Sequence, residues 1–383
     1  YEIRPRDWSS DVCSSDLRYQ NYAFNQTVNI LEASGPVAAG TNVVADTART
    51  QVLSVRDGRG QELVQANVAR NDGRGVFYSN SVPANQARIH GHFVLAHIGT
   101  EVFAVSGLRS LKRGGDAVLW REDLSQLGES ENAGMRMQTR QINNPWDDPR
   151  YVLADSSGRW LGQMGPLTRN GVTFQRGRDV HCVDPLSGDA LWVRNDIDAG
   201  SELFGDDEML FVVGPTSEEA LVLSTLDGSE LGRRKVVKSD ARWTTRGRNV
   251  LTWTQADGRL KLRLFDAWTG KDLLVRDCML GSKGCRIANE EFAVLQPDGN
   301  LFIASLDSGE LRVSANLEPC ANLSQLRVLR SQQQYHVIAN LPLANPKTNV
   351  QPIQQPGASI YLQRALVYAF DRVSGKTMWQ VPA

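Results

Sequence analysis

The stretch that decides the fold is His181-Cys182-Val183-Asp184-Pro185-Leu186-Ser187-Gly188-Asp189-Ala190-Leu191-Trp192, which predicts a strand, a tight turn and a second strand. An Asp side chain four residues before a Gly can accept hydrogen bonds from the backbone N–H groups of the turn. The Gly accepts the positive φ that closes the loop. Together these features are typical of a β-hairpin.

The same pattern recurs along the chain. Close copies run from Leu264 to Leu273 and from Ala369 to Trp379, and looser copies from Leu223 to Leu231 and from Ala304 to Leu311. The central turn glycines stand at 188, 228, 270 and 309, in steps of 40, 42 and 39 residues, with further turns at Gly60, Gly115 and Gly375. A period of about 40 to 45 residues is typical of a β-propeller blade. We therefore predict an all-β propeller of about seven four-stranded blades, within a range of six to eight.

A large apolar residue follows each turn. It is tryptophan in the best copies, Trp192 and Trp379, and we assign the role to Leu231, Leu274 and Leu311 in others. The copies retain the Asp or Ser, the Gly and the apolar residue but never His181, so we expect the motif to fasten each blade to its neighbour and to have no catalytic role. Trp268, inside a repeat turn, is expected to pack on the next blade.

The motif Asp-x-x-Ser/Thr-Gly-x-x-x-Trp, seen from Asp184 to Trp192 and from Asp371 to Trp379, resembles the repeat of the pyrroloquinoline-quinone-like (quinoprotein dehydrogenase-like) β-propellers with their tryptophan docking motifs. The resemblance extends from about residue 50 to the end. It implies a propeller fold and, as an expectation, a bacterial protein outside the cytoplasm, in the periplasm. That superfamily includes quinone-dependent dehydrogenases as well as outer-membrane assembly scaffolds.

Composition narrows the range of partners. Lys plus Arg number 42 against 43 Asp plus Glu, a balance that gives no basic excess for nucleic acid. No apolar run reaches the roughly 18 residues that a membrane helix needs. We therefore expect neither nucleic-acid binding nor a membrane span in this chain.

Residues 1–17 have neither strand nor helix periodicity. They resemble the translation of a sequencing-adapter oligonucleotide joined to a gene fragment, and we expect them not to belong to the native protein. Residues 18–383 are then the propeller, a fragment of a larger protein, with residues 18–50 contributing strands to an incomplete first blade.

Acidic clusters are the first candidates for chemistry. Asp206, Asp207 and Glu208, and Glu290 with Glu291, offer paired carboxylates for acid–base catalysis or a cation. Each cluster falls where neighbouring repeats place another polar hairpin turn, so we favour solvated turns. A propeller glycosidase would need two carboxylates facing each other across one mouth of the propeller.

The histidines and cysteines provide weaker candidates for a functional site than the acidic clusters. His90 and His92, two apart on an expected strand, could share a metal with His97 or His181, but no carboxylate or cysteine stands nearby at ligand spacing, and we predict no metal site. Cys278 and Cys285 bracket a short loop that could close with a disulfide or carry two reduced thiols. No two cysteines are adjacent, unlike the pair that quinone-binding dehydrogenases place against their cofactor.

Two insertions are the most informative feature for function. One runs from Asp123 to Asp155, between two blades, and includes Trp146-Asp147-Asp148, which could stack on a sugar or a peptide but which we favour as a loop cap. The other runs from Leu341 to Gln363 and interrupts the second turn of the last blade. Links between blades and second turns lie on the same face of a propeller, and long loops on a rigid scaffold commonly carry function.

We therefore expect a non-catalytic scaffold that binds a protein or small ligand at this loop face, with no catalytic residue, metal or cofactor assigned. The alternative is a quinone-dependent dehydrogenase that uses pyrroloquinoline quinone (PQQ) with calcium.

Overall fold

A computed structural model describes the chain in two parts. In the first part it describes residues 18–21, 26–34, 37–43, 51–57, 62–67, 86–90, 93–98, 101–106, 118–124, 138–142 and 150–154. In the second it describes residues 163–382 apart from 238–240, 288–289, 332, 342–352, 356–357 and 361–363. The possible artefact at residues 1–17 lies outside these ranges. The described residues contain no helix long and apolar enough to cross a membrane.

Six antiparallel sheets of four strands each make up most of the described fold, as predicted. In five of them the strands follow one another along the chain. These five are β6 (Gln86–His90), β7 (Phe93–Ile98), β8 (Glu101–Ser106) and β9 (Val118–Asp123); β12 (Gln163–Thr168), β13 (Gly171–Arg176), β14 (Asp179–Val183) and β15 (Ala190–Arg194); β16 (Glu202–Gly205), β17 (Met209–Val213), β18 (Glu219–Ser224) and β19 (Glu230–Lys235); β20 (Arg242–Arg246), β21 (Asn249–Ala256), β22 (Arg259–Asp266) and β23 (Asp272–Met279); and β24 (Lys283–Ile287), β25 (Glu291–Leu295), β26 (Asn300–Ser305) and β27 (Leu311–Asn316).

The sixth sheet contains an interruption. It is formed by β28 (Gln325–Arg330), β29 (Gln334–Leu341), β32 (Arg364–Asp371) and β33 (Thr377–Pro382). Between β29 and β32 the chain forms a separate hairpin, β30 (Ile353–Gln355) with β31 (Ala358–Ile360). Because Leu341 pairs directly with Arg364, the blade closes without the insertion.

The N-terminal sheet differs from the prediction of an incomplete blade. It has five strands in sequence order, β1 (Arg18–Asn21), β2 (Gln26–Ser34), β3 (Val37–Val43), β4 (Gln51–Asp57) and β5 (Glu62–Asn67). Since β2 lies next to β6, the strands β2 to β5 correspond to a full blade and β1 is an additional strand at its inner edge. The prediction of an incomplete blade is therefore wrong.

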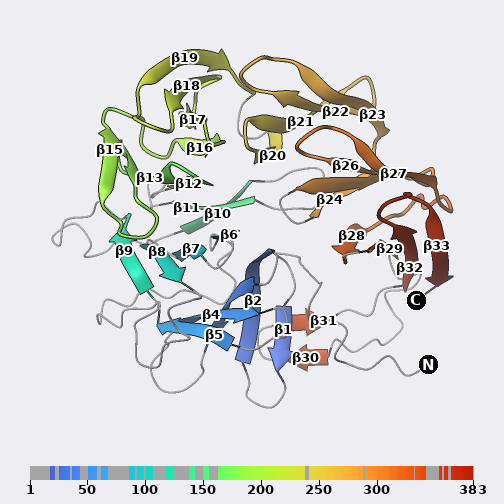
Figure 1. Cartoon of the computed structure of the whole chain (residues 1–383). Coiled ribbons are helices and arrows are strands. Elements are labelled where there is room, and N and C mark those ends of the chain that lie inside the picture. The colour runs from blue at the N-terminus through green and yellow to red at the C-terminus, as the bar shows by residue number, and fades with distance from the viewer. Residues whose placement is uncertain are drawn as a thin grey trace.

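The large sheets are arranged around a common centre, and in the four-stranded ones the first strand is innermost and the fourth is at the periphery (Figure 1). Inner strands of neighbouring sheets are in contact, as β12 with β16, β16 with β20 and β24 with β28. Burial follows the same gradient, because β25 is buried along its whole length whereas β27 alternates between exposed and covered positions. The core lies between sheets: Leu95 and Trp120 from one sheet pack with Val172 and Phe174 from the next.

The repeat turns form as the sequence predicts. Asp184 Oδ1 accepts hydrogen bonds from the backbone N–H groups of Leu186 and Ser187, both at 2.8 Å. Gly188 closes the turn at φ 78°, and the four equivalent glycines of the later sheets also have positive φ. All seven large sheets share one register shift between their last two strands.

Two tryptophans fasten neighbouring sheets. The indole N–H of Trp120 donates to the carbonyl oxygen of Pro185 at 2.9 Å, and that of Trp192 donates to the carbonyl oxygen of Thr225 at 3.0 Å. Each ring also lies against the turn glycine of the next sheet, since a Cβ on Gly188 would be 2.7 Å from Cγ of Trp120.

The shared register corrects the predicted equivalents of these tryptophans. The positions that match Trp192 are Gly232, Leu274 and Val313, so Leu274 was placed correctly and Leu231 and Leu311 were not. The sequence alone does not show which position after the turn matches Trp192, because Leu231 and Leu311 lie only one and two residues before the matching positions. Trp268 also packs in the opposite direction from the prediction, against a cluster that includes Val236 of the preceding sheet and beneath the guanidinium of Arg234.

The first insertion links β9 to β12 and so runs from residue 124 to 162, beyond the predicted end at Asp155. Within it, β10 (Gln138–Ile142) pairs with β11 (Arg150–Ala154) as a separate two-stranded sheet. In antiparallel blades the first and repeat turns lie on one face, and the second turns and inter-blade links lie on the other. Both insertions therefore emerge on the same face, as predicted.

Candidate functional site

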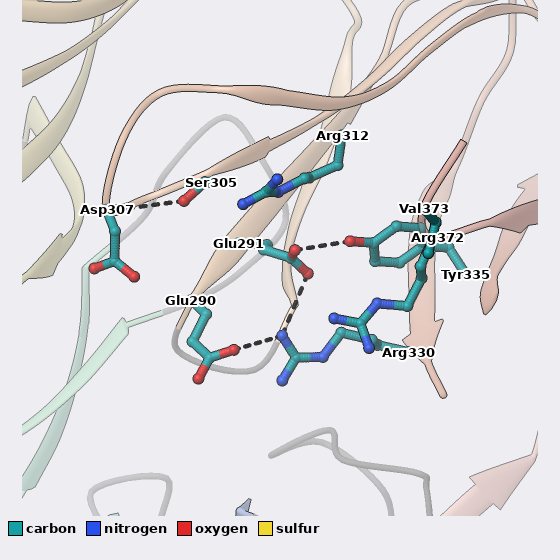
Figure 2. A pocket seen from close by; sticks show the side chains of 9 residues that line it. All are labelled: Glu290, Glu291, Ser305, Asp307, Arg312, Arg330, Tyr335, Arg372 and Val373. Atoms are coloured by element: carbon teal, nitrogen blue, oxygen red, sulfur yellow. Dashed lines mark hydrogen bonds and ion pairs between the residues drawn. The ribbon is translucent and has the colours of Figure 1, made fainter. Parts of the chain in front are cut away.

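A polar cleft of about 520 Å³ opens between the last two sheets (Figure 2). It lies on the face that carries the repeat turns, opposite the two insertions. The side chains around it come from the first and repeat turns and the outer strand of one sheet and from the first and repeat turns of the next, including the strand ends beside these turns. The lining residues are Glu290, Glu291, Ser305, Asp307, Arg312, Arg330, Tyr335, Arg372 and Val373.

Strand ends position the central side chains. Glu291 is the first residue of β25, Arg330 is the last of β28, and Tyr335 is the second of β29. Since β24 and β28 are neighbouring inner strands, the hairpin turns that follow them lie side by side. The topology of the repeat thus brings together residues about 40 positions apart in the sequence.

A buried hydrogen-bond network occupies the floor of the cleft. The hydroxyl of Tyr335 donates to Glu291 Oε1 at 2.7 Å, and these residues are 1% and 6% exposed. Arg330 Nη1 donates to Glu290 Oε2 at 2.6 Å and lies 3.4 Å from Glu291 Oε2. A buried carboxylate is tolerated only when it is paired and hydrogen-bonded, and Glu291 has a partner on each oxygen.

The surroundings shift the pKa values of Tyr335 and Glu290. Burial raises the pKa of Tyr335 to about 12, and the neighbouring Glu291 carboxylate adds to the effect. Burial by itself would raise the pKa of Glu290, but the hydrogen bond from Arg330 and the charges of Arg330, Arg246 and Arg372 outweigh it, so this pKa lies below its usual value. A general acid or base needs a pKa near the working pH, which neither Tyr335 nor Glu290 has.

The rim of the cleft carries more exposed groups. Arg312 Nη1 pairs with Glu310 Oε2 at 2.8 Å, and Arg246 Nε pairs with Asp307 Oδ1 at 3.1 Å. Arg372 Nη1 donates to the carbonyl oxygen of Ser331 at 2.9 Å, and its guanidinium lies over the ring of Tyr335.

The acidic turn from Asp206 to Glu208 is a structural turn. Asp206 Oδ1 accepts from the backbone N–H groups of Glu208 and Met209, at 2.9 and 3.0 Å. Asp207 binds the preceding sheet, because its backbone oxygen accepts from the side-chain amide of Asn170 at 2.7 Å. These contacts fit the polar-turn interpretation.

For Glu291, however, the expectation of a solvated turn is wrong, because its side chain is enclosed by Tyr335 and Arg330. Sequence reasoning missed both partners. The available signal was Tyr335, a hydroxyl-bearing residue at a strand position that is apolar in the other aligned repeats. Arg330 has no comparable signal, since arginine is common at strand ends.

The histidines are dispersed. β6 ends at His90 and β7 begins at Phe93. His92 lies outside the described residues, and so does the expected placement of both rings on one strand. His97 is buried in β7. His181 lies in a different sheet from His97, where its ring stacks on that of Phe174. In the parts of the chain that the structure describes, no three His, Cys, Asp or Glu side chains are grouped as a metal site.

The cysteines in the described part of the chain, Cys182, Cys278, Cys285 and Cys320, are free thiols, which answers the question left open for Cys278 and Cys285. Burial raises the pKa values of Cys182 and Cys278 to about 12, so neither is a thiolate at neutral pH. Cys278 and Cys320 belong to different core clusters. These residues do not fit a quinone site built on an adjacent cysteine pair. Trp146, Asp147 and Asp148 lie outside the described residues.

Comparison with known proteins identifies distantly similar structures and a matching protein family. The computationally designed protein Ika8 is 14% identical, with 97% of this chain and 90% of that chain covered and a TM-score of 0.45. BamB from Moraxella catarrhalis is 14% identical, with 82% of each chain covered and a TM-score of 0.40. AztD from Citrobacter koseri is 13% identical, with 87% and 92% covered and a TM-score of 0.36.

No curated protein matches the chain. Residues 104–381 match the family described as outer membrane protein assembly factor BamB. This range is well over half of the chain; it contains the last five four-stranded blades almost completely and the outer strand β9 of the one before them. The chain is therefore a member of the BamB family of PQQ-like β-propellers.

Proposed function

We propose that this protein is a non-catalytic scaffold that binds a protein partner through the two insertions on one face of the propeller. The observation that carries the proposal is that neither insertion is needed to complete a blade. The hairpins β10–β11 and β30–β31 form sheets of their own, and the β29–β32 pair closes at Leu341 and Arg364 without its insertion. Segments that add nothing to the blade sheets are available for recognition.

The cleft on the opposite face also favours binding over catalysis. Its buried carboxylate is saturated by Tyr335 and Arg330, and the pKa values of Tyr335 and Glu290 are shifted away from neutrality. Tyr335 therefore stays protonated and Glu290 stays charged near pH 7, so neither exchanges a proton there.

Family membership suggests the setting. The family description names an outer membrane protein assembly factor. We infer that this chain assists such assembly and, from that role, that it acts outside the cytoplasm. The side-chain contacts of Trp120 and Trp192 are, in this proposal, the docking contacts of the repeat, which keep the blades rigid beneath the binding loops.

Deletion of one insertion tests the proposal. Removing Asn345 to Gly357 should leave the blade intact, because the remaining residues still connect two strands that are already paired. The probe is a fluorescently labelled, unfolded outer-membrane β-barrel polypeptide, and its binding is followed by anisotropy. We expect the deletion to weaken binding by about tenfold, equivalent to roughly 1.4 kcal/mol.

The matched control is Leu226→Ser, which changes an exposed side chain on the opposite face. It should leave binding within about twofold of the wild type. Unfolding of the deletion variant, or undiminished binding by it, would overturn the proposal. Thermal unfolding with added PQQ and Ca²⁺ tests the rival enzyme: we expect no change in Tm, whereas a rise by linkage would favour the dehydrogenase.

A further inference from the structure

The internal repeat provides a reference for the polar cleft. Tyr335 pairs with Phe370, immediately after the shared register shift. In each of the other four aligned sheets of the second part, the equivalent residue is apolar and fully buried. These equivalents are Val172, Leu210, Val250 and Phe292.

The repeat turn of the last sheet departs from the pattern in the same place. Arg372 is the third residue after the register shift, a position occupied elsewhere by residues without charge, namely Pro185, Thr225, Ala267 and Leu306. Tyr335 thus stands where the other sheets have an apolar residue, and Arg372 stands where they have an uncharged one. Both side chains line the same cleft. Residues that depart from the pattern of a repeat are expected at functional sites, where a role other than packing selects the side chain.

Three guanidinium groups approach the cleft from separate elements, as Figure 2 shows for Arg312, Arg330 and Arg372. Arg330 is engaged by two carboxylates. Arg312 is paired with Glu310, the residue just before β27, and the two side chains are 40% and 61% exposed. An exposed pair of this kind contributes little, so an incoming carboxylate can replace Glu310 at small cost.

The arginines around the cleft favour the charged form of a carboxylate. The pKa of Glu290 is lowered although burial opposes this, and Arg246 and Arg372 contribute in addition to its direct partner Arg330. A second carboxylate entering the cleft is exposed to the same arginines. The bidentate geometry of a guanidinium matches a carboxylate.

An exposed apolar residue stands beside these arginines. Val373 is 96% exposed and follows Arg372 in the repeat turn. The same turn packs on β27, since a Cβ on Gly375 would lie 2.5 Å from the backbone oxygen of Arg312. Arg312, Arg372 and Val373 therefore form one wall of the cleft.

We propose that this cleft binds an acidic segment of a partner polypeptide, with a carboxylate held by Arg312 and Arg372 and an adjacent apolar side chain on Val373. The site is on the opposite face from the insertions. It does not depend on the scaffold proposal above, and the two can fail separately because their probes and variants differ.

The test uses the full chain and three labelled peptides. Their sequences are Gly-Glu-Leu-Glu-Gly, the uncharged Gly-Gln-Leu-Gln-Gly and the basic Gly-Lys-Leu-Lys-Gly. Fluorescence anisotropy should show binding of the acidic peptide, weakened by salt because the contacts are between charges. Arg312→Gln should weaken this binding by about tenfold, within the range for loss of a charge pair at an interface.

Arg276→Gln is the matched control, since Arg276 is an exposed arginine on the outer strand of the preceding sheet. It should leave the affinity unchanged and so separate a local contact from the loss of one positive charge. Val373→Ser should weaken binding of the acidic peptide and have no effect on the same peptide with Ala in place of Leu. Equal binding of all three peptides, equal effects of Arg312→Gln and Arg276→Gln, or no binding by the acidic peptide would overturn the proposal.

Discussion

At the scale of single residues, the repeat turn combines two requirements at one glycine. Gly188 has a φ of 78°, which disfavours any side chain, and its missing Cβ leaves room for the ring of Trp120. Gly270 occupies the same turn position at φ 72°, but nothing lies within 4 Å of where its Cβ would be. The two glycines therefore separate backbone strain from close packing.

We predict that Gly270→Ala will destabilise the protein by about 1 to 2 kcal/mol, the cost of a left-handed residue. Gly188→Ala should cost about 1 to 3 kcal/mol more, because the methyl group displaces a packed tryptophan. Denaturant unfolding of both variants measures the difference. Equal losses would show that the Trp120 ring is not constrained by the turn.

The sequence predicts the chemistry of the turns in detail but not the cleft. Asp184, Ser187 and Gly188 act on neighbours within four residues, so their roles can be read locally. The partners Glu291 and Tyr335 are 44 positions apart, and their contact depends on how two blades align. Once the repeat is aligned, Tyr335 is recognisable as an exception, although its partner is not.

At the scale of secondary-structure elements, the outer strands connect neighbouring blades by different means. In β19, Gly232 stands where β9 and β15 have tryptophan, and the connection is made two residues later. The guanidinium of Arg234 lies 3.7 Å from the ring centroid of Trp268, and its Nε donates to the backbone oxygen of that residue at 3.0 Å. The aromatic group is now in the turn and its partner is in the strand.

We predict that Arg234→Ala will destabilise the protein by about 1 to 3 kcal/mol, through loss of a cation–π contact and a hydrogen bond. Arg233→Ala, a neighbouring change on the exposed side of the same strand, should cost less than about 0.5 kcal/mol. Urea denaturation at constant pH checks both. A similar effect of the two substitutions would contradict the role assigned to Arg234.

The positions of the hairpin turns could be predicted from the sequence, because they depend on residues close together in the chain. Turn residues such as Asn170-Gly171 and Asp257-Gly258 mark reversals by local conformational preference. The extra strand β1 was not predictable, because its residues lack alternation and its place depends on pairing with β2. The face of the insertions followed from topology alone.

At the scale of the whole molecule, the sheets are joined near the centre by more than apolar packing. Glu202 in β16 and Arg242 in β20 form an ion pair at 2.7 Å, with side chains 7% and 1% exposed. The strands belong to neighbouring blades. Removing one partner of a buried pair leaves a charge without compensation, whereas replacing both often costs little.

We predict that Arg242→Met will destabilise the protein by about 3 to 5 kcal/mol. Adding Glu202→Gln to it should recover part of this loss, because no carboxylate then remains buried opposite an apolar side chain. A double-mutant cycle on unfolding free energies measures the coupling. Additive losses would show that the two residues act independently.

The direct pairing of Leu341 with Arg364 also has an evolutionary consequence. Because the blade is already closed at this pair, the connection can lengthen, shorten or change sequence at small cost, about 0.6 kcal/mol for each doubling in length. Selection on this segment is thus uncoupled from selection on folding. The same position is a permissive graft site, where a foreign epitope or binding peptide can be inserted while the seven large sheets keep their register.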